Sequence, residues 1–158
     1  MEADEFKRIA REYTDVVYRA TLSFCKNKSD AEDAVQNTFL KLLKTDTQFE
    51  DDEHIRKWLI RSAINECKNM WKSFWHRNVA SIDDLNKEPA YIETEKQELF
   101  SEVMKLPQKY STVLHLYYYE NYSCKEIADI LKISESGVQS RLMRARNILK
   151  ETLKEAWL

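Results

Sequence analysis

Apolar residues recur at helical spacing through the first half of the chain and predict three amphipathic helices. The inward stripe of the first is Phe6, Ile9, Tyr13, Val16, Val17, Ala20 and Phe24. After a break at Asn27-Lys28, the inward positions of the second are Ala31, Val35, Phe39 and Leu42. Ser29 and Glu32 have the spacing of a capping box at its start. A polar and acidic loop over residues 45–53 leads into the third, with Ile55, Leu59, Ala63, Cys67, Met70 and Phe74 inward.

The helical spacing of apolar residues stops after residue 77 and resumes at Leu99. Residues 78–98 have no helical stripe and contain Pro89, so they are expected to form a linker. Leu99, Phe100, Val103 and Leu106 begin a further helical segment, and the core of the helix after Pro107 is expected to contain Val113, Leu114, Tyr117 and Tyr118. The sequence predicts an all-α fold with two small helical domains, residues 1–77 and 99–158, joined by a flexible acidic linker over 78–98.

Residues 122–149 predict a short helix, a tight turn and a longer helix. Ser123 and Glu126 form a capping box, with Tyr122 and Ile127 as its staple, and Ser134 is placed to cap the second helix. Its inward stripe is Val138, Leu142, Ala145 and Leu149, and its outer face carries Ser136, Gln139, Ser140, Met143, Arg144 and Asn147. This arrangement is typical of a helix-turn-helix, which binds DNA through its second helix.

An ordinary helical hairpin with a solvated face is the alternative interpretation. However, the second helix carries Arg141, Arg144, Arg146 and Lys150, and no acidic residue lies between Ser136 and Lys150. A face that serves only solubility usually mixes charges of both signs. The charge pattern therefore favours DNA binding.

A second basic stripe runs along one face of the predicted third helix. Its members, which include no carboxylate, are His54, Lys57, Arg61, Asn65, Lys68, Lys72 and Trp75. A solvated face would explain a shorter run of charge. A stripe of this length that ends in an aromatic residue is better suited to following a phosphate backbone.

Composition excludes several classes of function. One Gly and two Pro in 158 residues leave no Gly-rich phosphate loop, so most nucleotide-dependent enzymes are excluded. The three His are isolated, and the sequence shows no paired nucleophile and base and no cluster of metal ligands. We therefore expect no catalysis, no cofactor and no metal. Cys25, Cys67 and Cys124 are far apart and odd in number, which suggests free thiols in a reducing cytoplasm. No membrane span or signal peptide is expected.

Charge is unevenly distributed. The formal net charge is −2, yet residues 1–77 carry 14 basic and 14 acidic groups, residues 78–98 carry 2 and 6, and residues 99–158 carry 9 and 7. Phosphate neutralisation supplies most non-specific DNA affinity. Such a chain should bind DNA weakly alone and should need a larger partner.

The helix-turn-helix resembles the promoter-reading domain of bacterial sigma factors. Thirteen positions carry the resemblance: Ser123, Glu126, Ile127, Ala128, Leu131, Ile133, Val138, Ser140, Arg141, Leu142, Arg144, Ala145 and Arg146. The chain departs from the family pattern at Lys132, at Ser136-Gly137 and at Gln139. The resemblance implies contacts with the −35 promoter element from Lys125, Ser136, Gln139, Ser140, Arg141, Met143 and Arg144.

The first domain resembles the same family. Asp30, Asp33, Gln36 and Phe39 match its polymerase-binding helix, which implies contacts with core RNA polymerase from Asp33, Gln36, Asn37 and Lys41. Trp58, Leu59, Arg61, Ala63 and Asn65 match the region that melts and reads the −10 element. That match implies −10 contacts from Lys57, Arg61, Asn65, Lys68 and Lys72, and a base-capturing loop at residues 48–54.

The resemblance covers nearly the whole chain and identifies it with the minimal, extracytoplasmic-function (ECF) group of sigma factors. It implies a cytoplasmic, non-catalytic specificity subunit that binds core RNA polymerase and promoter DNA, takes no small-molecule substrate, and is held inactive by an anti-sigma protein. Two binding alternatives remain open: a stand-alone helix-turn-helix regulator, which would need dimerisation and a stronger positive field, and a helical scaffold protein without DNA contact. An enzyme is the third.

Overall fold

The computed structural model describes residues 1–77 and 98–157, and it is helical throughout these two ranges apart from short turns and one loop. The predicted linker lies outside the described residues except for Glu98, the first residue of a helix. Contacts divide the chain into two compact units, Met1–Glu88 and Pro89–Leu158, called here the N-terminal and C-terminal units. The prediction of an all-α fold with two helical regions is confirmed.

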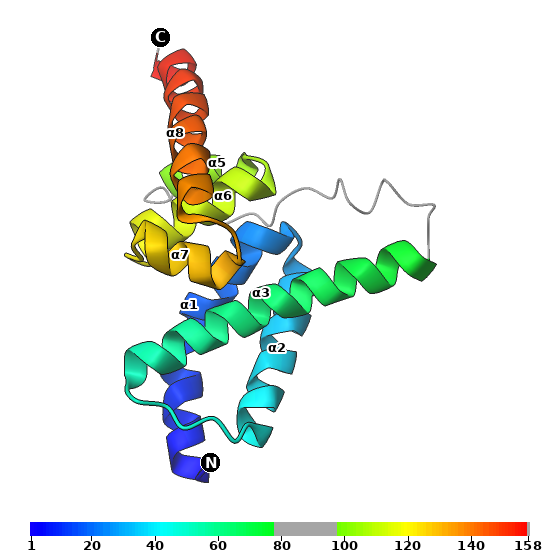
Figure 1. The fold of residues 1–158 in the computed structure, drawn as a ribbon. Helices are drawn as coiled ribbons and strands as arrows, with labels where there is room; N and C mark the ends of the chain where they lie inside the picture. Colours follow the sequence, from blue (N-terminus) through cyan, green and yellow to red (C-terminus); the bar gives the residue numbers. More distant parts are fainter. Residues whose placement is uncertain (78–97, 158) are drawn as a thin grey trace. The chain divides into compact units, whose positions relative to one another are not determined.

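Three helices form the N-terminal unit: α1 (Ala3–Cys25), α2 (Lys28–Lys44) and α3 (Asp52–Arg77), each packed against the other two (Figure 1). The predicted stripes supply most of its core, although five of their members are only half-buried: Phe6, Tyr13, Val16, Phe39 and Met70. The side chain of Phe74 lies outside the described residues. Ile60 and Ile64 are fully buried but were not predicted, because α3 is covered by two helices and needs a wider apolar face.

The turn between α1 and α2 differs from the prediction. Lys26 adopts the left-handed conformation (φ 63°), and the next residue, Asn27, is extended and accepts a hydrogen bond on its side chain from the Asp30 N–H at 3.0 Å. The predicted capping box of Ser29 and Glu32 is therefore wrong. Asn caps helices as well as Ser does, and α2 already begins at Lys28, so Ser29 lies within its first turn.

The cysteine prediction is also wrong. Cys25 and Cys67 are joined by a disulfide between α1 and α3, with their Cα atoms 6.1 Å apart, and only Cys124 is free. Both residues face the core, 4% and 0% exposed. Cys67 belongs to a predicted inward stripe and Cys25 does not, and sequence spacing alone could not show that the two helices cross at these positions.

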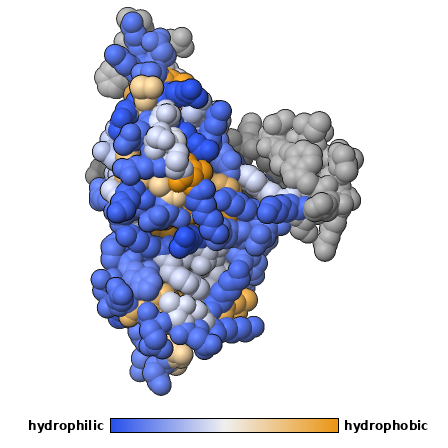
Figure 2. Space-filling view, viewed as in Figure 1, coloured by the Kyte–Doolittle hydropathy of each residue, from blue (hydrophilic) through white to orange (hydrophobic). Residues whose placement is uncertain are grey.

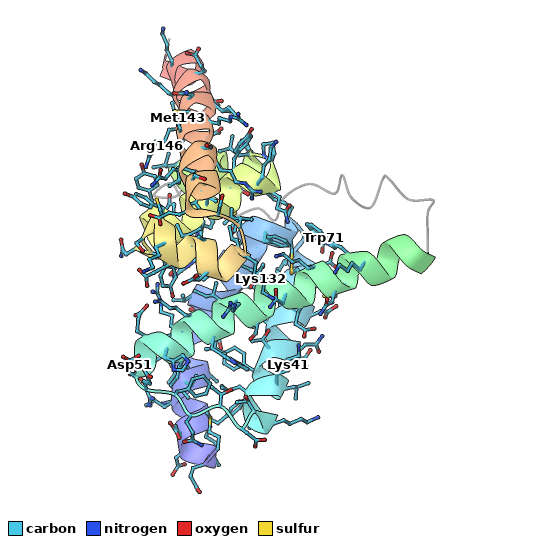
Figure 3. All side chains as sticks on the ribbon, in the orientation of Figure 1. Lys41, Asp51, Trp71, Lys132, Met143 and Arg146 are labelled. Atoms are coloured by element: carbon cyan, nitrogen blue, oxygen red, sulfur yellow. A yellow bond between two sulfur atoms is a disulfide. The ribbon has the colours of Figure 1, made fainter. Side chains whose placement is uncertain are left out.

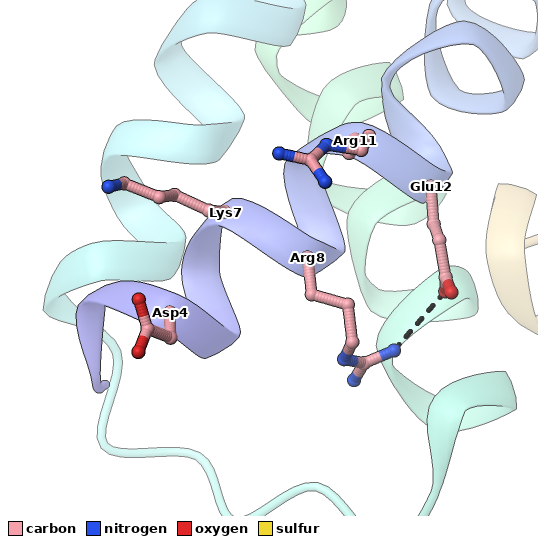
Figure 4. Close-up of a pocket in the computed structure, with 5 residues that line it drawn as sticks. All are labelled: Asp4, Lys7, Arg8, Arg11 and Glu12. Carbon is pink, nitrogen blue, oxygen red and sulfur yellow. Dashed lines mark hydrogen bonds and ion pairs between the residues drawn. The ribbon is translucent and has the colours of Figure 1, made fainter.

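An exposed ion-pair network fixes the start of α3 against α1. Arg8 donates to Glu12 at 3.2 Å and to Asp52 at 3.1 Å, and the second contact raises the pKa of Arg8. Figure 4 shows Arg8 reaching toward Glu12 beside Asp4, Lys7 and Arg11, all on α1. Exposed pairs of this kind contribute little to stability, because water screens the charges. The network therefore positions α3 more than it stabilises the unit.

The C-terminal unit contains α5 (Glu98–Lys105), α6 (Gln108–Leu114), the π-helical turn η2 (His115–Tyr119), α7 (Cys124–Leu131) and the long α8 (Glu135–Trp157). Helix α8 packs on α6 and α7. The fully buried side chains at this junction include Leu114, Ile127 and Leu142. They form a single core beneath the predicted helix-turn-helix.

The π-helical turn corrects the predicted core of this unit. Val113 and Leu114 are buried as expected, but Tyr117 is half-buried and Tyr118 is 52% exposed. A π-helix holds more residues per turn than an α-helix, so it shifts the inward positions and turns His115 and Leu116 into the core. His115 Nε2 lies 3.0 Å from Glu120 Oε1, which provides a partner for the buried imidazole.

The surface seen in Figure 2 is mostly hydrophilic, with small apolar patches. In the ranges that the structure describes, no helix has an apolar stretch long enough to cross a membrane.

Candidate nucleic-acid interface

Each helix of the helix-turn-helix begins at a serine cap. Ser123 Oγ accepts from the Glu126 N–H at 3.1 Å, and Glu126 Oε1 accepts from the Ser123 N–H at 3.2 Å, so the predicted capping box is present. Helix α7 ends at Lys132, which is left-handed (φ 58°). Ser134 Oγ then accepts from the Gly137 N–H at 3.0 Å, as predicted, and α8 begins.

These caps present one face of α8 to solvent. Val138, Leu142 and Ala145 are at most 2% exposed, and Leu149 is half-buried. The predicted −35 residues on the opposite face are exposed except for the half-buried Arg141: Ser136, Gln139, Ser140, Met143 and Arg144. Lys125 is exposed on α7. The structure therefore gathers the predicted −35 residues on α8 onto the solvent side, with Met143 (labelled in Figure 3) 57% exposed.

Arg146 has a different environment from the other cations of α8. Its Nε donates to Tyr118 Oη at 2.6 Å, and its guanidinium carbon lies 5.5 Å from the ring centroids of both Tyr117 and Tyr118. Cation–π contact of this kind attaches α8 to η2. Arg146 thus positions the helix, and the tyrosine cluster in the sequence was the signal that could have indicated it.

The predicted −10 residues lie along α3 and differ in exposure. Arg61 and Lys72 are exposed, whereas Lys57, Asn65 and Lys68 are half-buried. Lys68 Nζ lies 5.8 Å above the ring of Phe24, so this cation packs against the end of α1. The side chain of Trp75, the last member of the predicted stripe, lies outside the described residues.

Glu66, the one acidic residue in the sequence from 54 to 77, is paired with a residue of another helix. It forms an ion pair with Lys41 of α2, in which the Glu66 side chain is 12% exposed and that of Lys41 is 53% exposed. Figure 3 labels Lys41 on α2. The pair neutralises the carboxylate, so the basic stripe keeps its positive field. A partner that binds Lys41 must compete with Glu66.

Sequence reasoning missed an aromatic cluster at the start of α3. The ring of Phe49 packs edge-on against His54 at 5.2 Å and against Trp58 at 5.7 Å. The Glu50 N–H donates to His54 Nδ1 at 3.1 Å, and the His54 N–H donates to Asp51 Oδ1 at 2.8 Å. These bonds order the loop that the sequence assigned to base capture. A phenylalanine in an otherwise polar loop was the available signal.

The predicted polymerase-binding residues Asp33, Gln36, Asn37 and Lys41 are all exposed on α2. Sequence reasoning missed two apolar neighbours on this helix, Leu40 and Leu43, which are 50% and 45% exposed. Their signal was their position outside the inward stripe. Apolar residues exposed beside polar ones are typical of a surface that binds another protein.

Comparison with known proteins gives the same division of the chain. The family described as Sigma-70 region 2 matches residues 9–77, and the family described as Sigma-70, region 4 matches residues 96–149. The Bacillus subtilis ECF RNA polymerase sigma factor SigM is 33% identical over 87% of this chain and 88% of its own. SigV of the same organism is 31% identical over 84% and 81%.

Solved structures of similar fold include the sigma factor RpoE in complex with the anti-sigma factor NepR from Bartonella quintana. That structure has a TM-score of 0.78 at 23% identity and covers 96% of this chain and 98% of its own. CnrH in complex with the cytosolic domain of CnrY has a TM-score of 0.65, also at 23% identity, and covers 98% and 90%. These likenesses concern the fold. With both sigma-70 regions matched in order and the relatives aligned along most of their length, the chain belongs to the ECF group of RNA polymerase sigma factors, the non-enzymatic subunits that promote transcription initiation.

Proposed function

We propose that the two units of this sigma factor divide promoter reading between them, with duplex −35 DNA bound by α8 and the separated −10 strand bound by α3. The observation that carries the proposal is a pair of cationic faces, one in each unit, whose side chains are exposed or half-buried. On α8 the cations lie opposite a buried stripe, and on α3 Arg61 and Lys72 are exposed while Lys57 and Lys68 are half-buried.

Within α8, residues near the helix start reach base edges and later ones meet the backbone. The exposed amide of Gln139 suits bidentate pairing with adenine, and the exposed guanidinium of Arg144 suits guanine. Ser136, Ser140 and Met143 line the same face. Arg141 and Lys125 lie toward its flanks and serve as phosphate contacts.

Within the N-terminal unit, Lys57, Arg61, Lys68 and Lys72 follow the phosphates of the −10 strand. Asn65 carries both a donor and an acceptor and lies in the middle of this row, so it is assigned a base contact. The ordered loop with Phe49, His54 and Trp58 supplies aromatic surface next to the strand, and stacking on such rings is favourable for any base.

The exposed face of α2 is assigned to core RNA polymerase. Asp33, Gln36 and Asn37 provide its polar contacts, and Lys41 joins them at the cost of its pair with Glu66. The proposed domains are residues 1–77 for polymerase and −10 binding and residues 99–158 for −35 binding, with residues 78–98 as the linker. An anti-sigma protein is proposed too, supported by the solved sigma factor RpoE, whose structure contains the anti-sigma factor NepR. A cytoplasmic location is also proposed, supported by the cytosolic domain of CnrY in the CnrH complex.

Run-off transcription with purified core polymerase tests the function. Adding the protein should produce specific transcripts, whereas the protein alone should bind promoter duplex weakly because its net charge is −2. A stable, sequence-specific complex without polymerase at physiological salt would contradict the proposal and favour a stand-alone regulator.

Variants test the residue roles in the same assay. Asp33→Lys with Gln36→Ala should weaken the polymerase complex without unfolding the unit, because both residues are exposed. In a randomised −35 library, Gln139→Ala should relax the preference at one position, worth about 1–3 kcal/mol of discrimination. Lys125→Ala is the matched control and should weaken all sequences alike. An unchanged library after both Gln139→Ala and Arg144→Ala would assign base reading to other residues.

A further inference from the structure

The disulfide between Cys25 and Cys67 has no role in the function proposed above. Cys25 is the last residue of α1, and Cys67 lies in the middle of α3, between Asn65 and Lys68. The two helices also pack on each other through side chains beside this bond, where Phe24 stacks on Trp71 with ring centroids 5.2 Å apart. Figure 3 labels Trp71 beside the end of α1. The helix contact therefore does not depend on the covalent bond.

The spacing of the two residues suits both redox states. A Cα separation of 6.1 Å lies within the range that a disulfide requires, so closing the bond needs no helix movement. In the reduced state, two buried thiols are acceptable core side chains, because free cysteine is among the most buried residue types. The same packed unit can thus hold either the disulfide or the thiols.

We propose that Cys25 and Cys67 form a reversible disulfide that makes the stability of the N-terminal unit depend on the thiol redox state. In proteins that work in a reducing compartment, disulfides are typically transient and redox-sensing. The oxidised form locks the end of α1 to the part of α3 that carries Asn65 and Lys68. The reduced form keeps the same fold through packing alone and opens more readily.

The oxidant is a low-molecular-weight disulfide. The Cys25 thiolate attacks one of its sulfurs, forms a mixed disulfide and releases one small thiolate. The Cys67 thiolate then attacks Cys25 Sγ of the mixed disulfide, closes the protein bond and releases the second small thiolate. The two cysteine protons end on the two small thiols, and two electrons pass from the cysteines to the oxidant. Cys25 reacts first because it ends a helix, where local opening is easiest.

The consequence for α3 can be stated from neighbouring contacts. Lys68 Nζ lies over the ring of Phe24, the residue next to Cys25, so the cross-link holds a proposed strand-binding cation against α1. Oxidation should therefore preserve promoter opening at temperatures at which the reduced protein loses it. This coupling rests on the proposed function, whereas the chemistry of the bond does not.

The test uses the full chain with Cys124→Ser, which removes the third thiol and prevents exchange. After incubation with oxidised glutathione, digestion without reductant should yield a peptide pair linked through Cys25 and Cys67, and intact mass should show the loss of two hydrogen atoms. Dithiothreitol should reverse both under native conditions. Closing a loop of 42 residues should raise the melting temperature of the N-terminal unit by roughly 15–30 °C.

Cys25→Ala with Cys67→Ala in the same background is the control, and because no thiol remains its melting temperature should not respond to either reagent. Absence of the linked peptide, equal melting of the oxidised and reduced forms, or resistance of the bond to dithiothreitol in the folded protein would each overturn the proposal. None of these measurements needs polymerase or promoter. A failure of the proposed sigma function would therefore appear only in transcription and would leave these results unchanged.

Discussion

Adjacent residues of α8 allow stability and DNA reading to be separated. Leu142 is 2% exposed and belongs to the stripe that packs on α6 and α7, whereas Met143 is 57% exposed on the opposite face. Leu142→Ala removes a buried side chain whose neighbours on the stripe, Val138 and Ala145, are too small to fill the space. The expected loss of stability in the C-terminal unit is about 2–5 kcal/mol. Met143→Ala should change it by less than about 0.5 kcal/mol.

Hydrogen exchange of the full chain, followed by mass spectrometry, measures the two units separately. A unit of this size has a total stability of roughly 3–9 kcal/mol, so Leu142→Ala should remove much of the protection of α6, α7 and α8. Protection of α1, α2 and α3 should not change. Met143→Ala should keep full protection yet alter promoter recognition. Equal loss of protection in both variants would refute the assignment of inner and outer faces.

The remaining predictions concern the left-handed turns and the −10 face. Lys132→Gly should stabilise the C-terminal unit by about 0.5–1 kcal/mol, because φ is 58° there and glycine adopts this left-handed conformation without steric cost. Lys132→Ala should bring no gain. Urea unfolding measures the stability of both variants, and equal effects would contradict the argument. Burial lowers the pKa of Lys26 from 10.5 to about 8, so between about pH 8 and pH 10 the unfolded chain binds more protons than the folded one. Stability of the N-terminal unit should therefore rise with pH across that window, and Lys26→Met should remove the rise; a flat profile in the parent protein would exclude a buried Lys26 cation. Asn65→Ala should impair strand separation, measured by permanganate reactivity of promoter thymines, with little effect on duplex binding, and normal melting would remove Asn65 from its assigned role.

The sequence predicted helix type and inward faces well, because amphipathic periodicity reports burial directly. Both caps of the helix-turn-helix were also predictable, since Ser123 and Ser134 act on residues only three positions away. The Asn27 cap was missed because both Asn27 and Ser29 have side chains that can cap a helix at this point in the sequence. Each cap depends on residues within a few positions of one another, so the one wrong prediction was a choice between Asn27 and the nearby Ser29.

What the sequence could not predict depends on contacts between distant segments. The pairing of Cys25 with Cys67 and of Lys41 with Glu66 requires knowledge of how the helices cross. The π-helical turn at His115–Tyr119 has no periodicity of its own, so an α-helical template placed Tyr118 in the core. The candidate DNA-facing residues could be predicted because the side of a helix opposite its inward stripe is exposed. The contacts of Phe49 with His54 and Trp58 could not, because they depend on the conformation of the loop before α3.

The ion pair between Lys41 and Glu66 also restricts how this sigma factor can be rebuilt from parts of its relatives. Helices α2 and α3 are separate segments in sequence, so they invite independent exchange in hybrid proteins. A hybrid with a foreign α2 that lacks a cation at position 41 would leave Glu66, which is 12% exposed, without its partner on the helix that carries the basic stripe. The two helices should therefore be transplanted together, or Glu66 should be replaced in the same step.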